Sequence, residues 1–296
     1  MSSLLRRPAE LRSHNRPLRV EQLDNSARAE LTELADTDPI VNAVVSSRLH
    51  AVGSLDARDL GGTALGVRDD AGRLTGAAFN GGNLLPIGGG PAEWEVLARH
   101  LARRRRGCSS IVGPADTVAG LWRVLAAVWG PARAVRAQQP LLALDGSARP
   151  RGGHPAVRRI RPVELDAYLS AASAMFTEEL GITPQQGAGP GDYRNRVARL
   201  IADGRAFGVV DDTGSVLFKA DIGAISPSSC QVQGVWVRPD LRGRGLGTAA
   251  LAEVFRHALT LAPSVSLYVN DYNVAARRVY ERLGMWQVAT LSTVLF

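Results

Sequence analysis

The amino-acid sequence predicts a mixed α/β fold, an α+β mixed sheet built as two similar halves. Patterns typical of strands and of helices alternate along the 296 residues, which indicates helices packed on a sheet. Residues 145–155 are rich in Gly, Pro and Ser and lack apolar periodicity, as is typical of a linker. We therefore expect two domains, residues 17–147 and 156–296, after a polar N-terminal lead.

The sequence of the first half predicts a strand, two helices, three strands, and then alternating helices and strands. The helix expected at 91–105 carries Trp94, Leu97 and Leu101 on one face. A turn at Asp69–Gly72 favours a hairpin. The expected strands are 18–23, 63–67, 74–79, 83–87, 109–112 and a final strand or pair at 133–144; the expected helices begin at Asp24 and Asp38 and span 91–105 and 116–129.

The second half shows a similar order. An opening strand leads into a helix whose inward face includes Leu165, Tyr168 and Ala172. A loop of glycine and proline follows at 181–191, and loops this long tend to be functional. The expected strands are 157–162, 206–210, 215–224, 230–237 and 265–270; the expected helices are 162–180, 192–203, 246–261 and 273–284.

The stretch from Gly234 to Thr248 organises the second half. Its first residues favour a strand because β-branched and aromatic side chains fit a pleated surface. Pro239 ends that strand, glycines follow, and an amphipathic helix begins directly. A glycine-rich turn at a helix start can direct several N–H groups at an anion.

Two phosphate-binding motifs are excluded at this turn. A Walker loop ends in Gly-Lys-Ser/Thr, yet the only lysine of the chain is Lys219. A dinucleotide fingerprint places its first glycine straight after the strand, whereas Arg-Pro-Asp-Leu intervenes here. Arg242, Gly245 and Gly247 instead satisfy the pattern Arg/Gln-x-x-Gly-x-Gly/Ala.

This pattern resembles the pyrophosphate-binding motif of the GCN5-related N-acetyltransferases (GNAT superfamily). Further along, Asn273, Tyr280 and Gly284 are spaced as in the segment that follows the coenzyme strand of that superfamily. The match covers residues 206–296. The whole chain resembles actinobacterial members that carry an N-terminal domain of unknown function.

The resemblance implies acetyl-CoA as co-substrate, a primary amine as acceptor, and no metal. The strand before the turn would pair with the pantetheine arm, one of its N–H groups would polarise the thioester, and Asn273 would hold the arm. The implied coenzyme-binding residues are Val235, Trp236, Val237, Arg242, Gly243, Arg244, Gly245, Leu246, Gly247, Thr248 and Asn273.

The same resemblance assigns catalytic roles. Tyr280 matches the tyrosine that protonates the departing thiolate; the alternative is a tyrosine that only packs its helix on the sheet. Relatives often carry a glutamate base where this chain has Gln231 and Gln233. We expect Asp221, in an otherwise apolar strand and beside Gln231 or Val232, to act as base. Glu178 and Glu179, at the mouth of the long loop, are the rival bases, although the sequence favours them for binding a cationic acceptor. Gln231 and Gln233 are further candidates for binding the acceptor.

The first half is interpreted as a degenerate acetyltransferase-like copy, because its element order is also that of an acetyltransferase fold. Its turn, Gly88–Ala92, lacks the leading arginine or glutamine, and Pro91 removes a donor N–H. We expect no CoA binding there. The alternative is an unrelated α/β domain with the same order of elements by coincidence.

Charge and cysteine content limit the remaining functions. A net charge of +7 suggests nucleic acid, but Arg103–Arg106 lies at an expected helix end, where cations offset the dipole, and no aromatic stacking platform accompanies it. Two isolated cysteines and the lack of an apolar segment favour a cytoplasmic protein without membrane contact.

The residues and the resemblance together favour an acyl-CoA-dependent N-acetyltransferase that transfers acetyl to a primary amine. The alternatives are an acyl-CoA-binding sensor without catalysis, favoured by Gln231, and a nucleic-acid-associated regulator. The sequence leaves open the acceptor, the acyl chain length and a possible homodimer.

Overall fold

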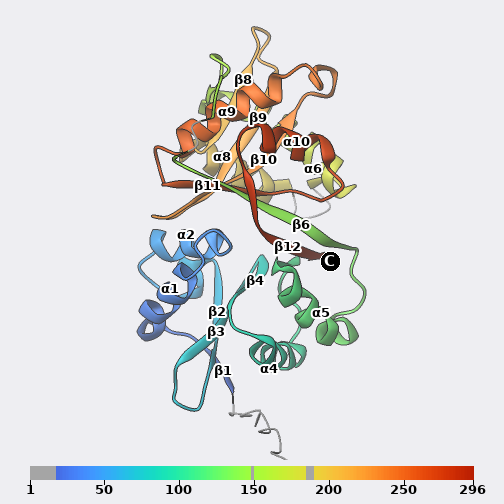
Figure 1. Ribbon diagram of the computed structural model, residues 1–296. Helices are drawn as coiled ribbons and strands as arrows, with labels where there is room; N and C mark the ends of the chain where they lie inside the picture. Colours follow the sequence, from blue (N-terminus) through green and yellow to red (C-terminus); the bar gives the residue numbers. More distant parts are fainter. Residues whose placement is uncertain (1–17, 148–149, 185–189) are drawn as a thin grey trace, which may run out of the picture.

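One continuous 12-stranded sheet passes through both halves, and helices cover it in each (Figure 1). The computed structural model describes residues 18–147, 150–184 and 190–296. The strands are β1 (Arg19–Gln22), β2 (Gly62–Arg68), β3 (Leu74–Gly81), β4 (Asn83–Gly88), β5 (Ser110–Pro114), β6 (Ala134–Asp145), β7 (Arg158–Arg159), β8 (Ala206–Val210), β9 (Val216–Ile225), β10 (Cys230–Val237), β11 (Ser264–Tyr268) and β12 (Trp286–Leu295).

The helices pack on the sheet through the apolar faces that the sequence predicts. On α9, for example, Leu251, Val254, Phe255 and Ala258 are fully buried. The α-helices are α1 (Arg28–Asp36), α2 (Ala43–Ala51), α3 (Ala57–Leu60), α4 (Pro91–Ala102), α5 (Ala115–Trp129), α6 (Leu165–Leu180), α8 (Pro190–Ala202), α9 (Leu246–Ala258) and α10 (Val274–Arg282). Among the described residues no helix is long and apolar enough to cross a membrane.

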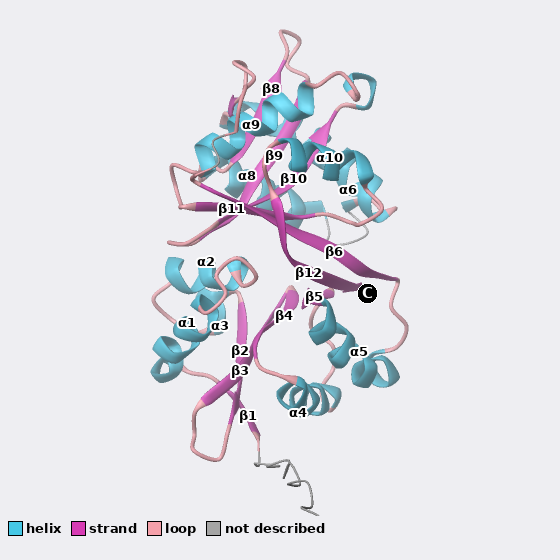
Figure 2. Ribbon diagram, in the orientation of Figure 1, coloured by secondary structure: helices cyan, strands magenta, loops and turns pink. Residues whose placement is uncertain are grey.

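The two halves exchange their final strands. The strand order is β1-β2-β3-β4-β5-β12-β6-β11-β10-β9-β8-β7. The last strand of the chain, β12, therefore pairs antiparallel with β5 of the first half, and β6 of the first half pairs antiparallel with β11 of the second. Figure 2 shows β6 and β12 running between the two layers of helices.

The side chains of the exchanged strands also complete the opposite cores. Leu142 and Leu144 of β6 pack in the apolar core that α9 and β11 form. Val294 of β12 packs with Leu97 and Leu121 in the core of the first half. Burial of apolar surface thus ties each half to a strand of the other.

A buried polar network crosses the same seam. Gln139 of β6 is 2% exposed. Its Nε2 donates to Asn270 Oδ1 at 2.9 Å, and its Oε1 accepts from Thr293 Oγ1 at 2.5 Å. Because a buried amide must be satisfied, this network fixes β6 and β12 relative to the loop after β11.

The predicted fold class is confirmed, with differences in some elements. The final segment of the first half is one strand, β6, and the opening strand of the second half is only Arg158–Arg159. Helix α4 ends at Ala102, so Arg103–Arg106 follow the helix rather than form its last turn. Of the long loop, residues 185–189 lie outside the described part of the chain. The domain limits 17–147 and 156–296 stay a prediction.

Candidate active site

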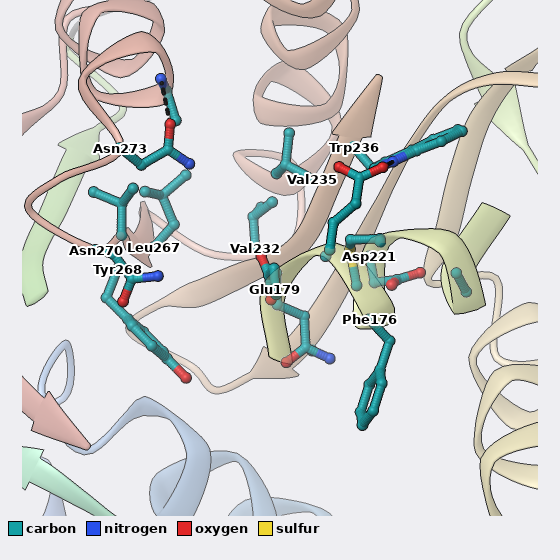
Figure 3. Close-up of a pocket in the computed structure, with 18 of the residues that line it drawn as sticks. Phe176, Glu179, Asp221, Val232, Val235, Trp236, Leu267, Tyr268, Asn270 and Asn273 are labelled. Atoms are coloured by element: carbon teal, nitrogen blue, oxygen red, sulfur yellow. Dashed lines mark hydrogen bonds between the residues drawn. The ribbon is translucent and has the colours of Figure 1, made fainter. Parts of the chain in front are cut away.

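Strands β10 and β11 open into a wedge at the centre of the second half. They pair in parallel only at Cys230 with Val265 and at Gln231 with Ser266. Beyond these pairs β10 carries a bulge, where Gly234 has φ +61°. A bulge bends its strand away from its partner. The residues Val232, Val235, Leu267 and Tyr268 line the resulting gap (Figure 3).

The wedge opens into a cavity of about 1700 Å³ that reaches the first half. The residues Arg48, Asn83, Ser110 and Val112 belong to its lining. The structure brings the sequence-predicted site residues together in this cavity, apart from Arg244, Leu246 and Gln231, which do not line it.

The glycine-rich turn leaves a run of backbone donors free. Gly243 and Gly245 have φ +75° and +85°, a conformation that glycine adopts without a steric penalty. In the described part of the chain, none of the six N–H groups from Gly243 to Thr248 donates to a protein acceptor; the first helical bond is Ala249 N–H to Gly245 O. These N–H groups and the α9 dipole form a site for a phosphate anion.

The corresponding turn of the first half is closed. The N–H of Gly90 donates to its own Glu93 carboxylate at 3.0 Å, where a bound anion would otherwise accept. A Cβ atom at Gly88 would lie 2.7 Å from Leu34, and one at Gly89 would lie 2.7 Å from Trp94.

The gap between β4 and β5 is filled as well. A Cβ atom at Gly113 of β5 would lie 2.7 Å from the ring of Pro86 on β4. Pro86 also has no N–H to offer a ligand from that strand. The first half therefore lacks the open wedge of the second, and Glu93 already holds one donor of its turn.

Two family models match different parts of the chain. Residues 62–168 match a family model described as a domain of unknown function (DUF4081), and residues 185–285 match that of the acetyltransferase (GNAT) family. Residues 185–285 are a GNAT-family domain. A search of curated proteins found no match.

Solved structures share the fold over the whole chain at low identity. A GNAT-family acetyltransferase from Colwellia psychrerythraea is 13% identical, with 94% of this chain and 99% of that chain covered, at a TM-score of 0.57. A Drosophila protein is 14% identical, with 94% and 98% covered, at 0.67. A tandem GNAT protein from the clavulanic acid biosynthesis pathway is 18% identical, with 94% and 98% covered, at 0.54. These likenesses show a tandem acetyltransferase-like fold.

Within the GNAT domain, Asp221 lies in a different register from the one predicted. It faces Gln233, not Gln231 or Val232, because the turn closes at Ser226–Ser229 and pairs Ile225 with Cys230. Gln231 is buried away from the cavity, whereas Gln233 lines it. The sequence prediction placed the turn too early, and a shift of one residue after Gln231 then moves Asp221 from Gly234 to Gln233.

Asp221 belongs to a buried cluster with Lys219 and Tyr168. Its Oδ2 accepts from Lys219 Nζ at 2.9 Å, and its Oδ1 accepts from the Tyr168 hydroxyl at 2.6 Å. Burial and the Asp221 charge hold the pKa of Tyr168 well above its usual range, so the hydroxyl keeps the proton that it donates. Protonating Asp221 would leave the Lys219 ammonium buried without its counterion.

The same lysine supports the bulge of β10. Its Nζ also donates to Gly234 O at 2.9 Å. A Cβ atom at Gly234 would lie 2.7 Å from Asp221 Oδ2 and 2.8 Å from Lys219 Nζ, so only glycine fits above the ion pair. Sequence reasoning missed Lys219 and Tyr168, although a single lysine inside an apolar strand was a usable signal.

Glu178 connects the end of α6 to the turn. Its Oε1 accepts from Trp236 Nε1 at 3.1 Å, and its Oε2 pairs with Arg242 Nη2 at 2.7 Å. The Nε of Arg242 donates in addition to Val237 O at 2.9 Å. Both members of this ion pair are thus held by protein groups in this structure.

Glu179 faces the cavity, and its carboxylate has the properties closest to those of a general base (Figure 3). The cavity walls replace part of its water, and this desolvation raises the pKa of Glu179 while Arg136 and Lys219 oppose the rise. Burial and the charge of Glu179 also raise the pKa of Tyr280 above its usual range.

Tyr280 and Asn273 lie on α10 at the other side of the wedge. Tyr280 is 6% exposed, and within the described chain its hydroxyl donates to no protein group. The Oδ1 of Asn273 caps α10 by accepting from Ala276 N–H at 3.1 Å, which leaves its NH₂ group available. No group of three or more His, Cys, Asp or Glu among the described residues could hold a metal ion.

Lys219→Met should lower the free energy of unfolding by about 3–5 kcal/mol, because it leaves the buried Asp221 charge uncompensated. The double variant Lys219→Met/Asp221→Asn removes both charges and should regain most of that loss. Urea unfolding of the wild type, the single variants and the double variant measures the coupling. Strictly additive effects would show that the two side chains do not act as an ion pair.

Proposed function

We propose that the protein is an acyl-CoA-dependent N-acetyltransferase that moves the acetyl group of acetyl-CoA to a primary amine by direct attack on the thioester. The observation that carries this proposal is the run of free N–H groups from Gly243 to Thr248 at the mouth of an open wedge. The GNAT fold is that of acetyltransferases, which supports the general activity. The cavity of about 1700 Å³ has room for a coenzyme and an acceptor together.

The wedge and the turn account for coenzyme binding in this proposal. The edge of β10 from Val235 to Val237 faces away from β9 into the gap and would pair with the pantetheine arm, as an added strand does. A backbone N–H there would polarise the thioester oxygen. The N–H groups of Gly243–Thr248 would bind the pyrophosphate, with Arg242 and Arg244 adding positive charge and the Asn273 amide contacting the arm.

Glu179 is the general base that the geometry favours over Asp221. A base must release the proton that it takes up, and the oxygens of Asp221 are already held by Lys219 and Tyr168. Glu179 is open to the cavity, and desolvation raises its pKa, which makes it a stronger base than an ordinary carboxylate. In the proposal Asp221 positions Lys219 and the bulge, Gln233 contacts the acceptor, and Glu178 orients Arg242.

Tyr280 supplies the proton for the leaving thiolate. The amine nitrogen forms a bond to the acetyl carbon, the carbon–sulfur bond breaks, the amine proton goes to Glu179, and the sulfur takes the Tyr280 proton. The proton held by Glu179 then passes through water to the tyrosinate, which restores both groups. Because burial keeps the pKa of Tyr280 above its usual range, the hydroxyl carries its proton at neutral pH before the sulfur takes it.

Gly245→Ala should weaken acetyl-CoA binding more than ~10-fold, because the αL conformation costs an alanine about 1–2 kcal/mol and a methyl group would enter the anion site. Gly214→Ala is the matched control: it has φ +82°, open space around its Cβ position and a place in the turn before β9, away from the cavity. Both variants should lose similar stability, and only Gly245→Ala should lose affinity in calorimetry. Equal affinities would remove the turn from coenzyme binding.

Tyr280→Phe should lower kcat roughly 10²-fold while the affinity for acetyl-CoA stays nearly level, since only the hydroxyl is removed. Tyr272→Phe changes a tyrosine that is 69% exposed and should have no effect. Steady-state kinetics with the best acceptor from an amine panel measures both. Tight binding of acetyl-CoA without transfer to any amine would instead favour an acyl-CoA sensor.

Glu179→Gln should lower kcat/KM and remove the acidic limb of its pH profile. The base acts only when deprotonated, so activity falls as the pH drops through the pKa of Glu179, which desolvation has raised. The limb should therefore lie above the range of an ordinary carboxyl. Glu281→Gln, on the exposed side of α10, serves as control. An unchanged limb in Glu179→Gln would exclude this residue as the base.

A further inference from the structure

The first half forms part of the cavity wall although its own wedge is closed. Helix α2 is docked on the GNAT domain, where Ile225 N–H donates to Ser47 Oγ at 3.0 Å. The next residue, Arg48, lines the cavity. In Figure 3 the blue ribbon of the first half lies below Tyr268 and Glu179, on the side away from the glycine-rich turn of α9.

Arginines from several elements line the cavity, among them Arg48 of α2, Arg136 of β6 and Arg196 of α8. Arg48 donates to Leu60 O at 3.1 Å and lies 4.5 Å from the centre of the Phe79 ring. Arg136 donates to the backbone carbonyl of Glu179 at 2.6 Å. Carbonyls and a ring thus hold these two guanidinium groups in place without neutralising their charge.

Arg196 has no such support. Within the described residues it makes no hydrogen bond and no ion pair, and none of the three arginines has a carboxylate within 4 Å. Arg48 and Arg196 come from different halves and line the same cavity. Burial, and next the charge of Arg196, lower the pKa of Arg48. Like charges brought together without a counterion are unfavourable, and such arrangements concentrate at binding sites.

The acidic groups of the cavity do not neutralise this cluster. Asp221 is paired with Lys219, and Glu178 with Arg242. On α8, Asp203 has Arg205 at 3.8 Å, and Asp192 lines the cavity one turn before Arg196 without an ion pair to it. Glu179 lines the same cavity, and its backbone carbonyl accepts from Arg136.

We propose that the amine acceptor carries a carboxylate, which Arg48 and Arg196 bind between the two halves while Arg136 adds positive charge. This inference rests on the proposed acetyltransferase function. A planar guanidinium binds a carboxylate through two parallel hydrogen bonds, and Arg48 and Arg196 each have donors that no protein group uses. The acceptor amine then lies toward Glu179 and the thioester. The acceptor class is an amino acid or a similar amine with an anionic group.

The test compares the proteinogenic amino acids with their C-terminal amides as acceptors. The wild type should transfer acetyl to the best amino acid at least ~10-fold more efficiently in kcat/KM than to its amide. Arg196→Gln should raise the KM of the acid, leave kcat and acetyl-CoA affinity level, and bring the ratio toward one. Arg194→Gln, on the same helix but paired with Asp166 outside the cavity, should keep the wild-type ratio.

A second measurement separates this inference from the proposed function. The acetyl-CoA-bound protein should gain thermal stability from the same amino acids and not from their amides, and Arg196→Gln should abolish the gain. If the protein binds acetyl-CoA and shows this shift but transfers nothing, the function is wrong and the anion site stands. Equal rates or equal stabilisation by acids and amides would overturn the anion site, as would a wild-type ratio retained in Arg196→Gln.

Discussion

The exchange of β6 and β12 is the constraint on which the rest of the molecule depends. Without β6, strand β11 would lose its antiparallel neighbour, and without β12 the edge of β5 would be unpaired. An unpaired strand edge exposes backbone donors and acceptors that require partners. The exchange joins two acetyltransferase-like halves into one sheet, and the buried Gln139 network fixes the seam. The cavity that we propose as the active site lies beside this seam.

The two halves share one fold, but the second has the open turn and wedge, whereas the first serves as structural support. Both have a strand, a glycine-rich turn and a helix in the same order. In the second half the N–H groups of the turn are free, whereas in the first Glu93 caps the helix, and Leu34 and Trp94 fill the turn. Pro86 occupies the gap between β4 and β5. In the first half, internal packing fills the space that a ligand would occupy, and this packing stabilises its core. Its helix α2 contributes Arg48 to the shared cavity.

The one lysine of an arginine-rich chain occupies a place where arginine would not fit. Its ammonium is a compact charge whose donors reach Asp221 Oδ2 and Gly234 O from a fully buried position. A planar guanidinium is larger and needs several acceptors in one plane. Lys219 therefore links a buried ion pair to the bulge that opens the wedge. The shape of the proposed coenzyme site thus depends on this ion pair.

The sequence by itself determined the elements and the glycine-rich turn, because both depend on local patterns. The apolar face of α9 and the spacing of Arg242, Gly245 and Gly247 are properties of neighbouring residues, and the fold class followed from them. The partners of Asp221 were decided only by tertiary structure, since the place where the β9–β10 turn closes sets every facing pair of the ladder. The strand exchange and the presence of Arg48 and Arg196 in one cavity depend on how residues far apart in the chain are brought together, for which no local pattern exists.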